Sequence, residues 1–278
     1  MRQTIAGIFF LLVAIAPHPA LGWGQKGHRV VASIAENHVT AETGRKIHEL
    51  LGNDNLAAIA VWADQVRSQR DETHGWHSVD IPRGSETFSR KRDCFRPEGT
   101  HKNAANDHHN CVVDRIAVFR DVLASVNKPK QERLEALRFL VHFVGDIHNP
   151  LHAIGDERGG NGVRVTEFGQ TICGRGNCNL HQTWDDGLIE HRGLAEEQYV
   201  EKVEQLIRDK HLKASGKIEG WANESHRCAK AAWVDSGASI DEGYYNKNIE
   251  MLDERLALAG LRLARLLDEA LAGKPAPH

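Results

Sequence analysis

The sequence has no strong excess of charge of either sign. Its 35 lysines and arginines stand against 38 aspartates and glutamates in 278 residues. Proteins that grip duplex nucleic acid over a broad surface usually carry a basic patch or stripe. That mode of binding is therefore not expected. Any anionic ligand must be held locally, by a metal ion or by a few arginines.

A second absence is a hydrophobic run long enough to cross a membrane, which needs about 20 apolar residues. The apolar run at residues 8–13 follows Arg2 and precedes Ala20-Leu21-Gly22. A charged start, a short apolar centre and a small-x-small end are typical of a secretory signal peptide. We expect residues 1–22 to be removed. Residues 23–278 would then form a secreted or periplasmic protein without stable membrane association.

The sequence also lacks an internal repeat and a linker, which predicts one domain, and we expect a monomer. Apolar residues recur at helical spacing in 30–35, 116–122, 134–144 and 252–271. Thr40 is placed to cap a helix that runs to Leu51. Two polar or glycine-rich segments, 72–110 and 153–180, interrupt this pattern, and the second contains a possible β pair between 163–165 and 170–172. The fold class is therefore all-α, mainly helical, with long loops and a short β-hairpin.

Cysteine is scarce, and all five cysteines follow the expected signal peptide. An exported protein can keep disulfides. Cys173 and Cys178 close a short glycine-rich loop and are expected to pair. Cys94 and Cys111 bracket a polar insertion and form the next candidate pair. Cys228 leaves the alternatives Cys94–Cys228 and Cys111–Cys228 open.

Histidine, in contrast, is abundant, with 17 residues. Two His-x-x-x-Asp pairs lie on predicted helical segments, His142–Asp146 and His181–Asp185. Positions i and i+4 share one helical face. Buried polar side chains need partners, which a metal ion can supply. A hydrogen-bonded pair in the core is the alternative for either pair alone, but the two together favour metal.

The segment after Asp146 offers a further ligand. Pro150 forces the helix to end or kink near Asn149. This break would turn His152 back toward the site. His148 is the alternative ligand, and spacing does not decide between them.

Two candidates lie upstream. Asp64 follows an apolar run, with Arg67 three residues later, and His77 precedes Asp80 by three residues. Each pattern is weak alone. An exposed helical ion pair is the alternative for Asp64 and Arg67, and a surface loop position is the alternative for His77.

The expected N-terminus completes the set. Cleavage after Gly22 would make Trp23 the first residue, with His28 five residues on. A free α-amine and the carbonyl oxygen of the same residue can chelate a metal ion. The reference pKa of an α-amine is only about 7.7–8.0, so a metal displaces its proton readily. A frayed N-terminus is the alternative.

Taken in order, these motifs resemble the zinc-dependent S1/P1 nuclease family and, more distantly, the bacterial zinc phospholipases C of the same fold. The spacing of five residues between Trp23 and His28, and aspartate rather than glutamate at 185, favour the nuclease branch. The matching blocks are Trp23-Gly24-x-x-Gly27-His28, Trp62-Ala63-Asp64-x-x-Arg67, His77-x-x-Asp80, the run from His142 to His152, Gly159-Gly160-Asn161 and His181-x-x-x-Asp185.

The resemblance implies three zinc ions, with Asp146 bridging two of them. Nitrogen and carboxylate ligands without thiolate suit zinc that stays open to water and substrate. The implied ligands are Asp64, His77, His142 and Asp146 for the first ion; the amine and carbonyl of Trp23, His28 and Asp146 for the second; and His152, His181 and Asp185 for the third.

The resemblance further implies hydrolysis of single-stranded DNA and RNA to 5′-nucleotides, together with 3′-nucleotidase activity. We hypothesise in-line attack by a zinc-bridging hydroxide. Asp64 would orient this nucleophile, and Arg67 would neutralise charge on the phosphorane. Asp80 and Asn161 match positions that hydrogen-bond a nucleobase, whereas Ser78 stands where the family often has a stacking aromatic. The alternatives are a zinc-dependent phospholipase C and a non-catalytic exported zinc-binding protein.

Overall fold

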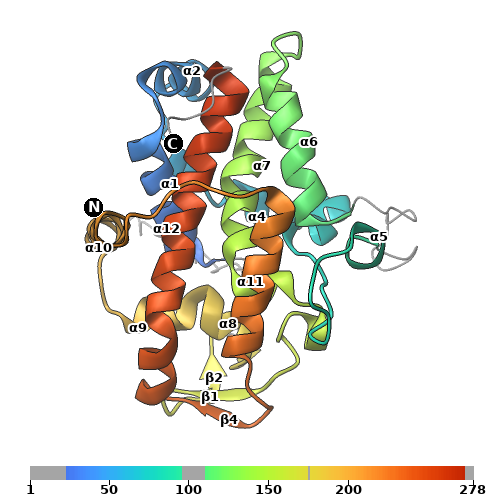
Figure 1. Cartoon of the computed structure of the whole chain (residues 1–278), viewed down its shortest axis with the longest axis vertical. Helices are drawn as coiled ribbons and strands as arrows, with labels where there is room; N and C mark the ends of the chain where they lie inside the picture. The colour runs from blue at the N-terminus through green and yellow to red at the C-terminus, as the bar shows by residue number, and fades with distance from the viewer. Residues whose placement is uncertain (1–22, 96–109, 175, 273–278) are drawn as a thin grey trace, which may run out of the picture.

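The computed structural model describes residues 23–95, 110–174 and 176–272 (Figure 1). The expected signal peptide lies outside these residues. Helices dominate, which confirms the predicted all-α class, and no described helix is long and apolar enough to cross a membrane. The longer helices are α1 (Gln25–His38), α2 (Ala41–Leu51), α6 (Val112–Ala124), α7 (Lys130–His148), α10 (Glu196–Lys210), α11 (Ile218–Ala232) and α12 (Glu242–Ala272).

Shorter elements connect these helices and carry much of the polar chemistry. The short α-helices are α3 (Leu56–Ile59), α4 (Trp62–Arg67), α5 (Arg90–Asp93), α8 (Leu180–Gln182) and α9 (Leu188–His191). Three 3₁₀ turns are η1 (Asp71–His77), η2 (Pro150–Ala153) and η3 (Asp156–Arg158), and η4 (Thr183–Gly187) is a π-helical turn. The strands are β1 (Val165–Glu167), β2 (Ile172–Cys173), β3 (Gly176–Asn177) and β4 (Ala238–Ile240).

The predicted start of α2 is confirmed. The Thr40 hydroxyl accepts a hydrogen bond from the Thr43 amide at 3.3 Å. Asp268 of α12 accepts bonds from the Thr40 amide at 3.0 Å and the Thr40 hydroxyl at 2.9 Å. The cap therefore satisfies an amide at the helix start and ties α2 to the C-terminal helix.

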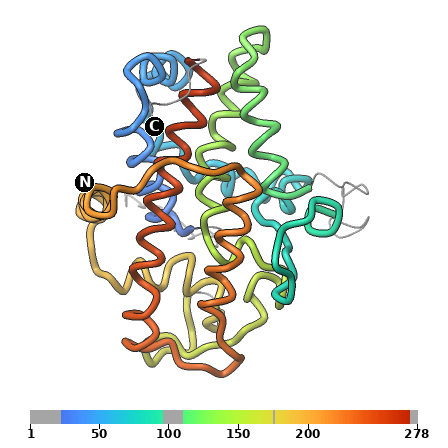
Figure 2. The backbone as a smooth tube through the Cα atoms, in the orientation of Figure 1, coloured from blue at the N-terminus to red at the C-terminus, as the bar shows by residue number. Residues whose placement is uncertain are grey.

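Helix α7 runs through the middle of the bundle, against α6, α11 and α12 (Figure 2). Every residue from Phe139 to His148 is buried. The apolar members form the core, but His142, Asp146 and His148 bring polar groups into it. Because buried polar groups need partners, this half of α7 requires a polar environment on at least two sides.

Helix α1 approaches α12 closely at Gly260. A Cβ atom at Gly260 would lie only 2.4 Å from Ile34 Cγ2 and 3.1 Å from the Val31 carbonyl oxygen. Only glycine permits this contact without moving one helix. The close packing matters because α1 carries His28 toward α7.

The β structure differs from the expected pairing of 163–165 with 170–172. Residues 163–165 instead bond to 178–180, through Val165 N to Cys178 O at 3.2 Å and Leu180 N to Val163 O at 3.0 Å. Strand β1 continues parallel to β4, and β2 pairs antiparallel with β3. Phe168 and Gly169 adopt positive φ in a tight turn, so the expected pair shortens to one bridge between Glu167 and Gln170.

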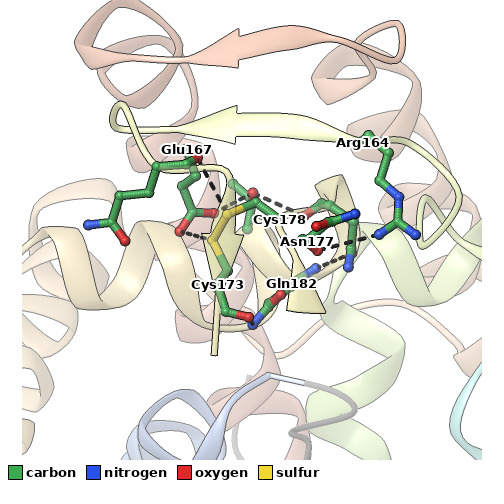
Figure 3. Close-up of a disulfide and its surroundings, with 9 residues drawn as sticks. Arg164, Glu167, Cys173, Asn177, Cys178 and Gln182 are labelled. Carbon is green, nitrogen blue, oxygen red and sulfur yellow. Dashed lines mark hydrogen bonds between the residues drawn. A yellow bond between two sulfur atoms is a disulfide. The ribbon is translucent and has the colours of Figure 1, made fainter. Parts of the chain in front are cut away.

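The preferred disulfides form, Cys94–Cys111 and Cys173–Cys178, and Cys228 is free. The two alternatives with Cys228 are therefore wrong. The second disulfide closes the β2–β3 loop, whose Cys173 carbonyl accepts a bond from the Gln182 side chain at 3.2 Å (Figure 3). Because Gln182 follows His181, this loop fixes the segment that carries a candidate ligand.

Candidate metal centre

The candidate ligands converge from α1, α4, η1, α7, η2, α8 and η4 into one region. Three groups have ligand atoms within 4.8 Å of one another. His142 belongs to two of the groups, so these two adjoin. The groups are His28, His142 and Asp146; Asp64, His77 and His142; and His152, His181 and Asp185.

Asp146 lies at the centre and is 0% exposed. Its Oδ1 is 3.4 Å from His28 Nε2 and 3.6 Å from His152 Nδ1. Its Oδ2 is 3.0 Å from His77 Nδ1 and 3.3 Å from His142 Nε2. The two carboxylate oxygens face different histidines, as a bridging carboxylate would.

The third group is built around the predicted i, i+4 pair. His181 Nε2 lies 3.4 Å from Asp185 Oδ2, and His152 Nε2 lies 3.8 Å from Asp185 Oδ1. The rings of His152 and His181 stack with centroids 4.9 Å apart. The π-helical turn η4 presents Asp185, and π-helical turns occur frequently at functional sites.

Backbone carbonyls orient three of the rings. The Nδ1 atom of His142 donates to Ala60 O at 2.8 Å, that of His152 to His77 O at 2.7 Å, and that of His181 to Gly159 O at 2.7 Å. A carbonyl only accepts, so each Nδ1 carries a hydrogen, and each of these rings presents an Nε2 lone pair when it is neutral. Metal-binding histidines are oriented in this way.

Gly159 explains part of the Gly-Gly-Asn motif. It has φ of 68°, and a Cβ there would lie 2.6 Å from Leu151 O and 3.2 Å from His181 Nδ1. Glycine adopts this conformation without strain. Its carbonyl can therefore reach His181 and set the ring's orientation.

The residues fit a metal centre because polar atoms facing it lack partners. Leaving one such buried atom unsatisfied costs about 1–3 kcal/mol, and divalent cations would satisfy several at once. Among the described residues, the buried atoms without a hydrogen-bond partner include His28 Nε2, Asp64 Oδ1, His142 Nε2, Asp146 Oδ1, His152 Nε2 and Asp185 Oδ2.

The pKa values of the histidines support the same interpretation. Burial lowers the pKa of His77 to about 4 and that of His181 to about 3, so both are neutral at pH 7 and able to bind a cation. For His142, burial is outweighed by Asp146 and Asp64, which raise its pKa well above 6.5. The positive charge of protonated His142 thus offsets the negative charges of Asp146 and Asp64. A metal ion bound at the same place could offset them instead.

Asp185 shows the complementary effect. Burial, followed by the charge of Asp186, raises the pKa of Asp185 well above its usual value. A buried carboxylate of this kind lacks a compensating positive charge. A cation held with His152 and His181 would provide it.

Arg67 is the cation that the chain itself supplies. Within the described residues, its buried Nε has no hydrogen-bond partner, and its Nη2 makes a long contact of 3.5 Å to His74 O. Burial lowers its pKa, and the charges of Asp64, Asp146 and Asp185 oppose that shift. Arg67 therefore acts electrostatically on both the Asp146 groups and the Asp185 group.

The structure decides between His148 and His152. His148 Nδ1 donates to Val144 O at 2.7 Å, and Nε2 accepts from Arg262 Nη1 at 2.9 Å. Both nitrogens are engaged away from the centre, so the alternative ligand His148 is wrong. His152 is the one beside Asp146 and Asp185.

The candidate base-binding residues lie on loops next to the centre. A Cβ at Gly155 would lie 3.0 Å from Asp80 Cβ, which places Asp80 beside the loop that leads to Gly159. The Asn161 amide group donates to Arg158 O at 2.9 Å. Contact with a base by either residue stays a prediction.

Trp23 is fully buried, so the expected mature N-terminus is not frayed. The amide of Gly24 donates to Asp185 O at 2.7 Å, which brings this segment beside the third group. A Cβ at Gly27 would lie 2.8 Å from Trp23 Cβ, so the glycine in the motif makes room for the tryptophan. Metal binding by the Trp23 amine stays a prediction.

Asn149 has a role that the sequence pattern did not predict. This fully buried residue donates from Nδ2 to Asp185 Oδ1 at 2.8 Å, and its Oδ1 accepts from Leu151 N at 3.0 Å. It therefore links the end of α7 to a carboxylate 36 residues away. No spacing pattern signals this contact, because it depends on how η4 packs against α7.

We expect Asn149→Ala to weaken metal binding at the His152, His181 and Asp185 group about 10- to 100-fold. Removing a residue that hydrogen-bonds to a metal ligand typically lowers metal affinity by that factor. Competition with a chromogenic chelator measures the affinity. Asn248→Ala, which removes a buried asparagine of α12 that bonds to Tyr244 O, is the matched control. Equal metal affinity in both variants would show that Asn149 does not position Asp185.

Comparisons with known proteins agree on one family. A family model described as S1/P1 Nuclease matches residues 23–272. Endonuclease 4 of Arabidopsis thaliana is 31% identical over 309 residues, covering 99% of this chain and 97% of the relative. Nuclease S1 of Aspergillus oryzae is 29% identical, with 91% and 93% covered. Nuclease P1 of Penicillium citrinum is 28% identical, with 89% and 97% covered.

Proposed function

This chain belongs to the S1/P1 nuclease family, and we propose that it is a zinc-dependent phosphodiesterase acting on single-stranded DNA and RNA. The products would be 5′-nucleotides, and the same site would remove phosphate from 3′-nucleotides. Family membership supports nucleic-acid hydrolysis in general. The observation that carries the finer proposal is the set of partnerless histidine nitrogens and carboxylate oxygens around Asp146 and Asp185.

Three zinc ions fit these residues. When bound, zinc lowers the pKa of water toward about 7 and polarises phosphoryl oxygens. The donor set is nitrogen and carboxylate oxygen. The described group that contains cysteines, Cys94, Cys111 and Asp114, is a different one, and its two sulfur atoms are joined in a disulfide. We propose the ligand sets that the family resemblance implies, including the Trp23 amine and carbonyl.

The protein's own groups have separate tasks in this proposal. The Asp64 side chain is 17% exposed, more than its neighbours Asp146 and His142, so its carboxylate can reach an entering water and orient it. Arg67 neutralises negative charge that grows on the phosphoryl oxygens in the transition state. Because its charge is already fixed in a buried position, little reorganisation is needed.

The substrate preference follows from the site's depth and the weak overall charge. A buried centre can admit a phosphodiester whose bases are unstacked, which favours single strands over duplexes. We propose that Asp80 and Asn161 hydrogen-bond the base next to the cleaved bond. Ser78 stands at the position where the family often has an aromatic residue that stacks on the base. Because stacking contributes about 1–3 kcal/mol per base, base binding should be weaker here.

We also propose export with removal of residues 1–22, and a monomeric state. The support is the sequence pattern at the N-terminus together with two disulfides, which persist in oxidising compartments. Cleavage before Trp23 would free its amine, which in the proposed ligand sets binds the second ion together with His28 and Asp146.

The purified exported protein tests the proposal. We expect its N-terminal residue to be Trp23, about three zinc ions per chain, and cleavage of single-stranded DNA to fragments with 5′-phosphates. Chelation should stop cleavage, and added zinc should restore it. Duplex DNA and phosphocholine release from phosphatidylcholine vesicles serve as comparisons. Faster vesicle hydrolysis than DNA hydrolysis would favour the phospholipase alternative, and zinc without any hydrolysis would favour a binding protein.

A further inference from the structure

A groove of about 680 Å³ is lined by residues of α11, of α12 and of the segment that joins α10 to α11. Its volume falls within the range that binds small molecules, about 300–1,000 Å³. Its wall toward α7 includes Arg262, which contacts His148 at the end of that helix. The groove is therefore separate from the metal centre, whose ligands do not line it.

The charge of the groove is strongly one-sided. Lys213, Arg227, Arg255 and Arg262 line it, and Glu224 is the one carboxylate among the described lining residues. The whole chain carries a formal charge of −3. Four cations around one small volume are therefore a local feature, and they favour an anionic ligand.

Two of these cations are buried and only partly compensated. Arg255 is 4% exposed and Arg262 is 2% exposed. Both pair with Glu224, at 3.0 Å and 2.7 Å. One carboxylate cannot balance two guanidinium groups, and an excess buried charge is unfavourable. An anion bound in the groove would lower that cost.

The other two cations are available for direct contact. Arg227 and Lys213 are exposed, and neither makes a side-chain hydrogen bond or ion pair within the described part of the chain. The guanidinium group of Arg227 can bind two oxygens of a phosphate at once. The buried Arg255 and Arg262 add positive electrostatic potential to the groove.

The remaining wall is apolar. Leu212, Ala231, Met251 and Leu258 line the groove beside the charged rim. A ligand that fits both surfaces has a dianionic head and a flat or apolar body. A nucleoside monophosphate has this chemistry, whereas inorganic phosphate would use only the rim.

We propose that this groove is a second ligand site that binds a nucleoside 5′-monophosphate, with its phosphate on Arg227 and Lys213 and its nucleoside against the apolar wall. The choice of ligand rests on the proposed function, since such molecules are its expected products. The site itself is defined by the groove's own charge and shape.

Cys228 provides a local test. Its thiol lines the groove, and the other four cysteines are in disulfides. A bound ligand should therefore slow the alkylation of Cys228 by iodoacetamide. We expect adenosine 5′-monophosphate to slow the reaction about tenfold at saturation, inorganic phosphate to do so only at much higher concentration, and adenosine to have no effect.

Charge reversal identifies the contact. Arg227→Glu should weaken protection at least about tenfold, which corresponds to 1.4 kcal/mol. Arg208→Glu, an exposed arginine of α10 outside the groove, gives the same change in net charge and should leave protection unchanged. Thermal unfolding confirms that both variants fold.

The outcomes separate this site from the active site. Arg67→Ala should leave protection intact, because Arg67 does not line the groove. Absence of protection, equal protection by adenosine or by inorganic phosphate, or an unaffected Arg227→Glu variant would each overturn the proposal. Protection of Cys228 does not require phosphodiester cleavage, so a failed nuclease assay would not contradict the second ligand site. In the same way, absence of protection would not contradict the proposed nuclease activity.

Discussion

Replacing Asp146 with asparagine is expected to remove nearly all hydrolytic activity. Asp146 is the carboxylate whose two oxygens face His28 and His152 on one side and His77 and His142 on the other. An amide keeps the volume but loses the charge and one of the two acceptor oxygens. We expect kcat/KM on single-stranded DNA to fall at least about a thousandfold, equivalent to about 4 kcal/mol, and zinc content to fall with it.

The control for this variant is Asp253→Asn. Asp253 is also a buried aspartate, bonded to Tyr199 at 2.8 Å and to Arg192 at 2.6 Å, on α12 away from the metal centre. It should lower the unfolding temperature without loss of zinc. Metal analysis and kinetics on both variants distinguish the two effects. An Asp146→Asn protein with full zinc content and normal kcat/KM would remove Asp146 from the centre.

Arg67→Ala is expected to lower kcat on single-stranded DNA about 100- to 1,000-fold while zinc content stays unchanged. Arg67 is not one of the proposed metal ligands, but its guanidinium group interacts electrostatically with the carboxylates of Asp64, Asp146 and Asp185. Removing one fixed donor that stabilises transition-state charge typically costs about 2.7–4 kcal/mol. Steady-state kinetics and metal analysis on the same preparation measure the two quantities.

Two further variants sharpen this test. Arg70→Ala removes an arginine three residues away that pairs with Glu72 and Glu135, and should retain normal kcat. Arg67→Lys keeps a positive charge but loses the planar guanidinium group, which can donate two parallel hydrogen bonds. It should therefore be more active than Arg67→Ala but less active than the unmodified protein. If Arg67→Ala turns over as fast as the unmodified protein, the charge on Arg67 has no part in the transition state.

Local sequence determined where some of the helices begin and end, including the end of α7, which carries candidate ligands. The Thr40 cap and the end of α7 before Pro150 were predictable because they depend on neighbouring residues and on fixed backbone chemistry. The short loop between Cys173 and Cys178 likewise left little choice of partner. The β pairing was not predictable, because residues 163–165 found partners at 178–180 rather than at the nearer segment.

The sequence by itself therefore determined which ligand types are present and which pairs share a helical face, since an i, i+4 relation is fixed by helix geometry. Only the tertiary structure decided that His152 faces Asp185 while His148 faces Arg262. It also decided that Asn149 donates a hydrogen bond to Asp185. Finally, it decided that Arg255 and Arg262 both pair with the carboxylate of Glu224. The reason is physical. These contacts join residues far apart in the chain, and their distances are set by how α7, α11 and α12 pack.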